Sequence, residues 1–199
     1  MTNQRVDTLI PPTLLALFNA IGQLNPEAKQ DIEKILQNQT FSKKDFILTQ
    51  GQVCRHIYFI EHGLARSFYL DDGKEITSWF MIENDVIISV KSFFLEVPTE
   101  EYIQALEDTS LYFISFHDLM ALYEVHPSFN TIGRRLTEIY YMKSEDRLQN
   151  IRKKDAFERY KFLITQHPEI IQRVSSRIIS SYLGITEETL SRLRAKKLT

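Results

Sequence analysis

The segment from Ser175 to Lys197 constrains the fold most, because it contains two short helical patterns separated by one glycine, Gly184. A helix-turn-helix packs two helices at about 90–120° through a turn of 3–4 residues that often contains glycine. Thr186 suits the N-cap of the second helix, since its hydroxyl can accept an otherwise unpaired backbone N–H. The apolar residues that the two helices would bury against each other are Ile179, Leu183, Ile185, Leu190 and Leu193. This pattern predicts a helix-turn-helix.

The remaining side chains of the second helix point outward in this arrangement, and they are polar or charged. They are Glu188, Thr189, Ser191, Arg192 and Arg194, with Lys196 and Lys197 just beyond. Such groups can contact base edges and phosphates of DNA. A generic helical hairpin on the surface is the alternative, but turn, cap, apolar spacing and polar face all agree with the DNA-binding motif.

Charge is distributed unevenly along the chain, whose formal net charge is −2. The segment from Arg152 to Thr199 holds 11 basic and 5 acidic residues, whereas residues 1–151 hold 13 basic and 21 acidic residues. A basic end on an acidic body favours contact with nucleic acid at that end. Charge alone would equally allow a solvated basic surface.

Length and composition exclude several classes of protein. The 199 residues suffice for one large or two small domains, and 43% hydrophobic with 25% charged residues is typical of a globular protein. No apolar run approaches the roughly 20 residues that span a bilayer, and the N-terminus lacks the pattern of a secretory signal. Cys54 stands alone, so it forms no internal disulfide and holds no iron–sulfur cluster. The sequence predicts a cytoplasmic protein without membrane contact.

Catalytic and metal-binding signatures are not recognisable. The histidines, at positions 56, 62, 117, 126 and 167, are scattered and form no pattern of metal-ligand spacing. The six glycines form no phosphate-binding loop. We therefore expect neither an enzyme nor a metal site, and no required cofactor.

A β-rich region is predicted between Thr40 and Ser115, where short runs of β-branched and aromatic residues alternate with turn residues. Asp72-Gly73 lies between two such runs and predicts a hairpin, because both positions tolerate positive φ. Short strands at this spacing are typical of a sandwich, a jelly roll or a barrel. Helical patterns precede this region, and Asn25-Pro26 marks the start of one of them.

A long helix is predicted from Pro127 to about Asn150. About 24 residues would span roughly 36 Å at 1.5 Å each. Its apolar stripe recurs every three to four residues, at Phe129, Ile132, Leu136, Ile139 and Tyr140. We expect the body to cover one side of this helix and a second copy of the chain to cover the rest.

Over nearly its whole length the chain resembles the cyclic-AMP receptor protein/Fnr (Crp/Fnr) family of bacterial transcription regulators. The resemblance is most specific from Ile178 to Arg194, IISSYLGITEETLSRLR, which is similar to the DNA-binding motif of that family. Phe46 to Tyr69 is similar to its cyclic-nucleotide-binding β-roll. Glu188 and Arg192 match the positions that face base edges, where glutamate can accept from cytosine N4 and arginine can bind guanine. We assign phosphate contacts to Thr186, Thr189, Ser191, Arg194, Lys196 and Lys197.

The resemblance also implies an effector pocket in the β-roll. Cyclic-nucleotide binders hold the phosphate with a cassette that begins Gly-Glu and ends Arg-Ser, where the arginine neutralises the phosphate. Here Ile88-Ser89 and Thr99-Glu100 occupy those positions, and no lysine or arginine lies between Lys91 and Arg134. We therefore expect no cyclic AMP binding in the usual way. Lys91 could still bind an anion from another direction, so a different effector remains an alternative.

The predicted fold class is α+β: an antiparallel, jelly-roll-like β-roll with flanking helices, a long dimerisation helix and a C-terminal helix-turn-helix domain. The predicted divisions are residues 1–125 for the sensor, 126–152 for the connecting helix and 153–199 for the DNA-binding domain. The function implied is that of a homodimeric, DNA-binding transcription regulator whose effector is unknown. Its partners would be double-stranded DNA and a second copy of the chain, with RNA polymerase as a further candidate. The alternative is a sensor or interaction module that does not bind DNA.

Overall fold

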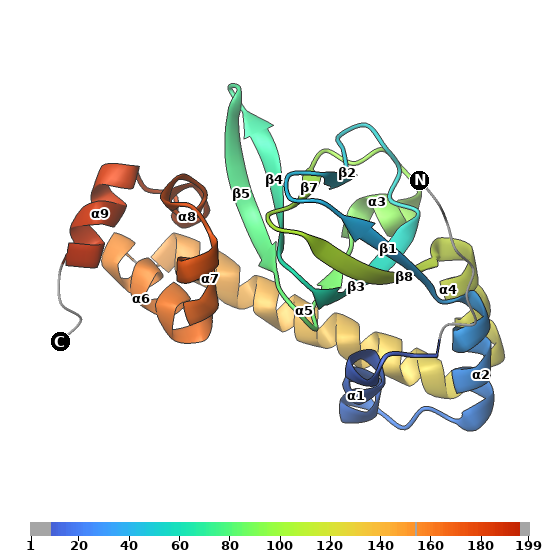
Figure 1. Ribbon diagram of the computed structural model, residues 1–199. Helices are drawn as coiled ribbons and strands as arrows, with labels where there is room; N and C mark the ends of the chain where they lie inside the picture. The colour runs from blue at the N-terminus through green and yellow to red at the C-terminus, as the bar shows by residue number, and fades with distance from the viewer. Residues whose placement is uncertain (1–8, 154, 196–199) are drawn as a thin grey trace. The chain divides into compact units, whose positions relative to one another are not determined.

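The computed structural model describes residues 9–153 and 155–195. Along the chain, helices precede and follow a β-rich segment, as the colours of Figure 1 show. The helices are α1 (Pro12–Ile21), α2 (Pro26–Ile35), α3 (Val90–Leu95), α4 (Phe116–Val125), α5 (Pro127–Lys153), α6 (Ala156–Gln166), α7 (Pro168–Arg173), α8 (Ser176–Leu183) and α9 (Glu187–Ala195). The strands are β1 (Gln37–Phe41), β2 (Phe46–Leu48), β3 (His56–His62), β4 (Ala65–Asp71), β5 (Lys74–Met81), β6 (Val86–Ile87), β7 (Tyr102–Ala105) and β8 (Thr109–Ser115).

Backbone contacts divide the chain into two compact units. Unit 1 is drawn from Met1–Ser67 and Phe80–Glu138, and unit 2 from Phe68–Trp79 and Ile139–Thr199. Most of the β4–β5 hairpin therefore groups with the C-terminal helices. The three-part division inferred from the sequence stays a prediction.

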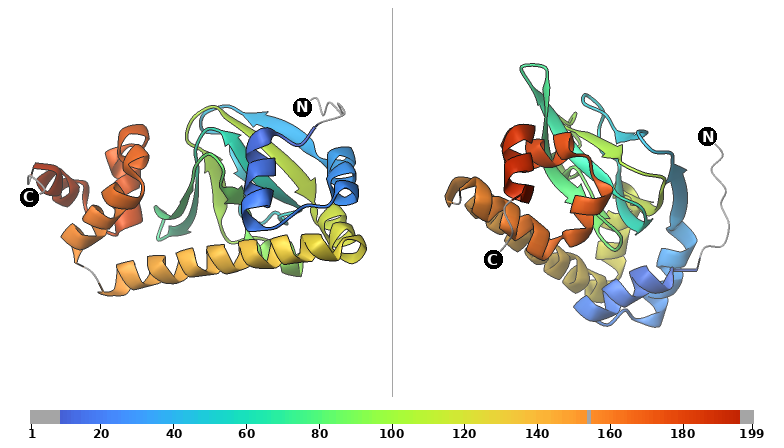
Figure 2. Two further views of the ribbon diagram at one scale, coloured as in Figure 1. Left: turned by 90° about the horizontal axis from the view of Figure 1, so that it is seen from below. Right: turned by 60° about the vertical axis from the view of Figure 1, so that its left-hand side comes forward.

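The long helix is present as a continuous element, α5, which Figure 2 shows in the left-hand view. It begins at Pro127 as predicted and ends at Lys153, three residues beyond the expected end. Phe129 and Ile132 are buried, whereas Ile139 is exposed. Leu136 and Tyr140 are partly buried. The predicted apolar stripe is thus fully covered only in the first turns of α5.

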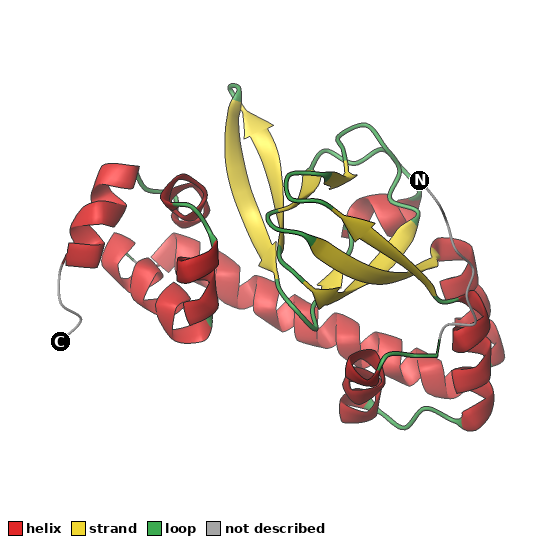
Figure 3. Cartoon of the chain, in the orientation of Figure 1, coloured by secondary structure: helices red, strands yellow, loops and turns green. Residues whose placement is uncertain are grey.

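The strands form two four-stranded sheets, drawn in yellow in Figure 3. Their strand orders are β1-β8-β3-β6 and β2-β7-β4-β5. The pairings of β8 with β1 and β3, of β3 with β6 and of β2 with β7 are antiparallel. Two antiparallel sheets with flanking helices confirm the predicted fold class.

The core of unit 1 is formed by strand side chains that alternate between buried and partly exposed positions. Leu111 and Phe113 on β8 are buried while Tyr112 between them is partly exposed, as the two-residue period of a strand requires. Ile103 and Ala105 on β7 are buried in the same way. Phe93 of α3 is fully buried, so this short helix is anchored to the core by one aromatic ring.

The Asp72-Gly73 turn forms as predicted, with φ angles of 47° and 75°. Positive φ at both central positions is the requirement of the type I′ hairpin turn, whose twist matches that of the strands. The aspartate tolerates this conformation, and the glycine adopts it without steric cost.

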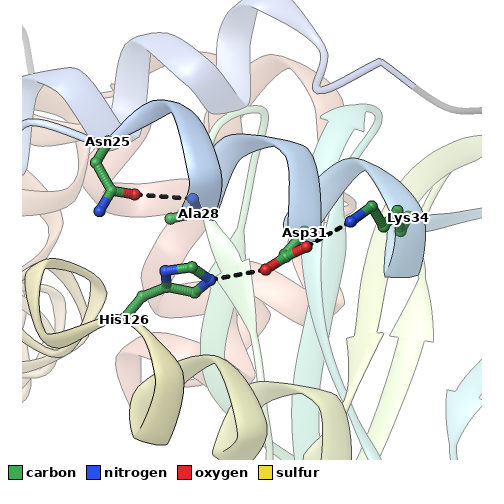
Figure 4. Close-up of polar contacts among 5 residues, drawn as sticks. All are labelled: Asn25, Ala28, Asp31, Lys34 and His126. Atoms are coloured by element: carbon green, nitrogen blue, oxygen red, sulfur yellow. Dashed lines mark hydrogen bonds and ion pairs between the residues drawn. The ribbon is translucent and has the colours of Figure 1, made fainter.

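The N-terminal helices are tied to the start of α5 by polar contacts (Figure 4). Asn25 caps α2 as predicted, since its Oδ1 accepts from the backbone N–H of Ala28 at 2.8 Å. On the same helix, the Asp31 carboxylate lies 2.9 Å from Nε2 of His126, which directly precedes α5, and 2.7 Å from Nζ of Lys34. The hydrogen bond from Lys34 lowers the pKa of Asp31, and the contact with His126 lowers it further.

Candidate nucleic-acid interface

The turn between α8 and α9 is built on Gly184. This residue has φ 64° and ψ 42°, the left-handed conformation that costs glycine least. The N–H of Ile185 donates to the carbonyl of Ser180 at 3.0 Å, and the N–H of Gly184 donates to that of Ser181 at 3.2 Å. These two bonds are the Schellman pattern that ends a helix. The sequence-based assignment of Gly184 to the turn is therefore matched by its geometry.

Helix α9 begins with the predicted cap. Oγ1 of Thr186 accepts from the backbone N–H of Thr189 at 3.2 Å, which satisfies one of the unpaired donors of the first turn. Glu187 and Glu188 follow in that turn, where negative charge is favourable near the positive end of the helix dipole.

The contact between α8 and α9 is apolar. Ile179 and Leu190 are fully buried, and Leu183 and Leu193 are nearly so, whereas Ile185 is only partly buried. Ser180 of α8 is also buried. Its Oγ has no hydrogen-bond partner among the described residues.

The outer face of α9 presents the predicted base-reading pair. An Oε1 of Glu188 lies 3.5 Å from a guanidinium nitrogen of Arg192, and the two side chains are 81% and 69% exposed. Because an exposed pair four residues apart on a helix stabilises it by only about 0.3–0.5 kcal/mol, both groups remain available for another partner.

The residues assigned to phosphates have mixed surroundings. Thr186 and Ser191 are exposed, and Thr189 is partly exposed. Arg194 is exposed and donates to Oγ of Ser176, at the start of α8, at 2.8 Å. Lys196 and Lys197 lie outside the described residues. Of the described members of the set, Thr189, Ser191 and Arg194 lie on α9 and Thr186 directly precedes it. Their roles remain predictions.

Helix α8 is held by two arginines that the sequence analysis did not single out. Nε of Arg159 on α6 donates to the carbonyl of Leu183 at 2.9 Å. The guanidinium of Arg147 on α5 lies 3.5 Å from the ring centre of Tyr182 and donates to the carbonyl of that residue. Burial lowers the pKa of Arg147. Cations at the C-terminal end of a helix are favoured by its dipole, so these contacts fix the end of α8 next to the turn.

Ser181 links α8 to the β4–β5 hairpin within unit 2. Its Oγ donates to the carbonyl of Glu75 at 2.7 Å and accepts from the N–H of Thr77 at 2.9 Å. A single hydroxyl thus pairs with two backbone groups of β5. No local sequence signal could reveal this contact, because its partners are more than 100 residues apart.

The residues assigned to the effector site lie in unit 1. Oγ of Ser89 and Oγ1 of Thr99 are 2.9 Å apart and buried, so the two ends of the cassette bond to each other. Ile88 is partly buried. Nζ of Lys91 lies 3.9 Å from the Glu100 carboxylate, and both side chains are largely exposed. The cation of this cassette therefore already has an anionic neighbour.

Other kinds of site find no support in the described part of the chain. Residues 9–153 and 155–195 contain no group of three or more histidine, cysteine, aspartate or glutamate side chains that could hold a metal ion. Within the same residues, no helix combines the length and apolar character needed to cross a bilayer. Cys54 is buried, which raises the pKa of its thiol.

Comparison with known proteins identifies the fold. Residues 38–126 match the cyclic nucleotide-binding domain. FixK2 from Bradyrhizobium japonicum is 23% identical and superposes with a TM-score of 0.66, over 81% of this chain and 84% of FixK2. A candidate transcriptional regulator of the Crp/Fnr family from Eubacterium rectale is 21% identical, with a TM-score of 0.68, over 89% of this chain and 83% of that one.

This is the Crp/Fnr fold. The same fold occurs in CLP of Xanthomonas campestris, a global regulator that responds to c-di-GMP, at 15% identity and a TM-score of 0.66, over 86% of this chain and 91% of CLP. A search of curated protein sequences finds no relative. The Crp/Fnr resemblance inferred from the two motifs is thus confirmed in the fold.

Proposed function

We propose that the chain is a sequence-specific DNA-binding transcription regulator. The observation that carries this proposal is the outward, exposed Glu188–Arg192 pair on α9. The turn before this helix, its cap and its buried face are those expected of a helix-turn-helix. Arginine binds the O6 and N7 atoms of guanine, and glutamate accepts from cytosine N4, so this pair can read one G·C step in the major groove.

The regulator would act as a homodimer through α5. Tyr141, Ser144, Leu148 and Ile151 recur at intervals of three and four residues, and all four are exposed. That spacing is the seam of a two-stranded coiled coil, in which apolar side chains pack between the helices. A dimer would present two α9 helices to major grooves about 34 Å apart on a pseudo-palindromic site. RNA polymerase is a further partner in this proposal.

The β-roll cassette would not hold a cyclic phosphate in the usual way. The Ser89–Thr99 hydrogen bond occupies hydroxyls that would otherwise face a ligand, and Glu100 competes for Lys91. A phosphate at this position would meet the carboxylates of Glu100 and Glu101. It would lack the arginine that neutralises the phosphate in cyclic-nucleotide binders. Calorimetry with cyclic AMP and cyclic GMP tests this point, and micromolar binding of either would contradict it.

Selection from randomised duplex DNA tests the DNA-binding proposal. The full chain is incubated with the pool at low salt, where phosphate contacts contribute most, and bound duplexes are separated by gel shift and sequenced. We expect enrichment of a two-fold symmetric motif. Lys197→Ala should then weaken all sequences alike and reduce the salt slope by about one unit, whereas a base-reading residue should change the preferred sequence.

A sensor or interaction module without DNA binding is the second candidate. It is favoured by Glu187 and Glu188, which place two exposed carboxylates at the start of α9, where DNA phosphates would repel them. The absence of any enriched motif at low salt would support this candidate. Catalysis has no comparable observation in its favour.

A further inference from the structure

Unit 1 contains an apolar cavity between the β1-β8-β3-β6 sheet and the helices α1, α2, α4 and α5. Figure 1 shows α1, α2, α4 and the first turns of α5 grouped at one end of the strands. Aromatic rings form one wall, since the ring centre of Phe129 lies 5.7 Å from that of Phe18 and 5.6 Å from that of Tyr123. The cavity is separate from the cassette, because neither Ser89 nor Thr99 lines it.

The volume of the cavity is about 70 Å³. One water needs roughly 10–15 Å³ of such space, and an engineered apolar cavity of about 150 Å³ stays dry and binds benzene. The space therefore suits a small molecule or the end of an alkyl chain, not a nucleotide. Water would gain little there, because a buried water needs two to four polar partners.

The lining determines which chemistry can enter. It consists of leucine, isoleucine, valine, phenylalanine, tyrosine and glycine, without a charged side chain. A charged group would lose its hydration without a compensating partner. Neutral, apolar ligands are consequently favoured over carboxylates, ammonium ions and phosphates.

Tyr123 supplies one polar group in the lining of the cavity. It is partly exposed, as are the lining residues Leu17, Gly133 and Leu136. Its phenol lies against Gly133, where an added Cβ would come within 2.2 Å of the hydroxyl oxygen. Among the described residues none hydrogen-bonds to this hydroxyl, and burial raises its pKa. The phenol is therefore neutral and able to donate to a ligand.

We propose that this cavity binds a small neutral apolar molecule, or an alkyl chain end, whose single polar group pairs with the Tyr123 hydroxyl. Ile132, Gly133 and Leu136 of the lining belong to α5, so a bound molecule would contact the helix that carries the dimer seam. An effector role for the ligand rests on the proposed function. Binding itself does not, because it is measured without DNA.

Methyl-labelled NMR of the full chain, titrated with 1-hexanol, tests the proposal. We expect saturable shifts of the Leu17, Ile132 and Leu136 methyl signals at millimolar alcohol. Hexanoate has the same chain but a charged end, and it should bind at least about fivefold more weakly. Absence of shifts at these methyls, or equal binding of alcohol and carboxylate, would overturn the assignment.

Two matched substitutions locate the site. Leu17→Phe adds volume to a lining position and should weaken hexanol binding by about tenfold or more, whereas Leu15→Phe, on the same helix but outside the lining, should change it by less than about twofold. Equal effects would refute the location. Should Leu17→Phe fail to fold, Gly133→Ala serves instead, since its methyl displaces the Tyr123 ring while favouring the helix. Unchanged hexanol binding by Gly133→Ala would also refute the location of the site.

Discussion

Two adjacent serines of α8 have opposite hydrogen-bonding surroundings, so their replacement by alanine should change stability in opposite directions. Oγ of Ser181 makes two bonds to β5, at 2.7 Å to the carbonyl of Glu75 and at 2.9 Å from the N–H of Thr77. Oγ of Ser180 is buried without a hydrogen-bond partner among the described residues. The chemical change is the same at both positions, and only the surroundings differ.

The magnitudes follow from these contacts. Each hydrogen bond contributes about 0.5–1.5 kcal/mol net, so losing two costs about 1–3 kcal/mol. Alanine returns roughly 0.5 kcal/mol through its higher helix propensity, which leaves Ser181→Ala destabilised by about 0.5–2.5 kcal/mol. Ser180→Ala gains the same propensity and removes a desolvated hydroxyl, so it should be stabilised by about 1 kcal/mol. The free energies of unfolding of the two variants should therefore differ by about 1.5–3.5 kcal/mol.

Urea unfolding followed by tryptophan fluorescence measures this difference. Trp79 is the single tryptophan of the chain and belongs to unit 2, so the signal reports on the unit that contains both serines. With a urea dependence of about 1–3 kcal/mol/M, the unfolding midpoints of the two variants should lie about 0.5–3.5 M apart. Amide exchange at Thr77 should also accelerate in Ser181→Ala alone. Destabilisation of equal size in both variants would refute the assigned hydrogen bonds.

Three further predictions concern the turn, the base-reading pair and a buried phenol. Arg192→Ala should weaken specific DNA binding by about 1–3 kcal/mol and relax the preference at one base pair. The control is Arg134→Ala, which removes the arginine of an exposed i,i+4 ion pair on α5 and should leave DNA binding unchanged. Similar DNA-titration curves for the two variants would contradict the readout role of Arg192. Gly184→Ala should lower stability by about 1 kcal/mol because of the left-handed conformation, and Gly184→Asn should recover most of the loss in thermal melting. Burial raises the pKa of Tyr58 to about 12, so the neutral phenol stabilises the fold below pH 10 and this contribution, roughly 3 kcal/mol, is lost as pH rises from 10 to 12. Phenolate absorbance is followed in an alkaline titration of the parent protein and of Tyr58→Phe. The variant should lack one group that titrates near pH 12 in the parent protein. Loss of a group that titrates near pH 10 would contradict the raised pKa of Tyr58.

Features with a local physical cause could be predicted from the sequence. The conformation of Gly184, the cap by Thr186 and the Asp72-Gly73 turn each depend on residues within a few positions. Such short-range signals are direct consequences of backbone sterics and hydrogen bonding. The start of α5 at Pro127 belongs to the same class, since proline is favoured in the first turn of a helix.

Features that depend on tertiary contact could not be predicted. Arg147 stacks on Tyr182 across 35 residues of sequence, and Ser181 bonds to a strand more than 100 residues away. Nothing in the local pattern distinguishes Ser181 from Ser180, although one is paired and the other is not. The exposure of Ile139 likewise depends on where the neighbouring elements end. Periodicity assigns side chains to a face of a helix but cannot say what covers that face.

The restraints on α8 bear on how α9 would read DNA. Arg159 binds the carbonyl of Leu183, Arg147 binds that of Tyr182, and Ser181 pairs with β5, so three separate elements hold one short helix. Groups that must be held within about 0.5 Å of a productive geometry depend on such supporting contacts. Since α9 is joined to α8 through the Gly184 turn, a shared apolar contact and the hydrogen bond from Arg194 to Ser176, the position of Arg192 depends on that of α8. Loosening α8 through Ser181→Ala should therefore reduce discrimination between bases, even though Arg192 itself remains exposed and unchanged.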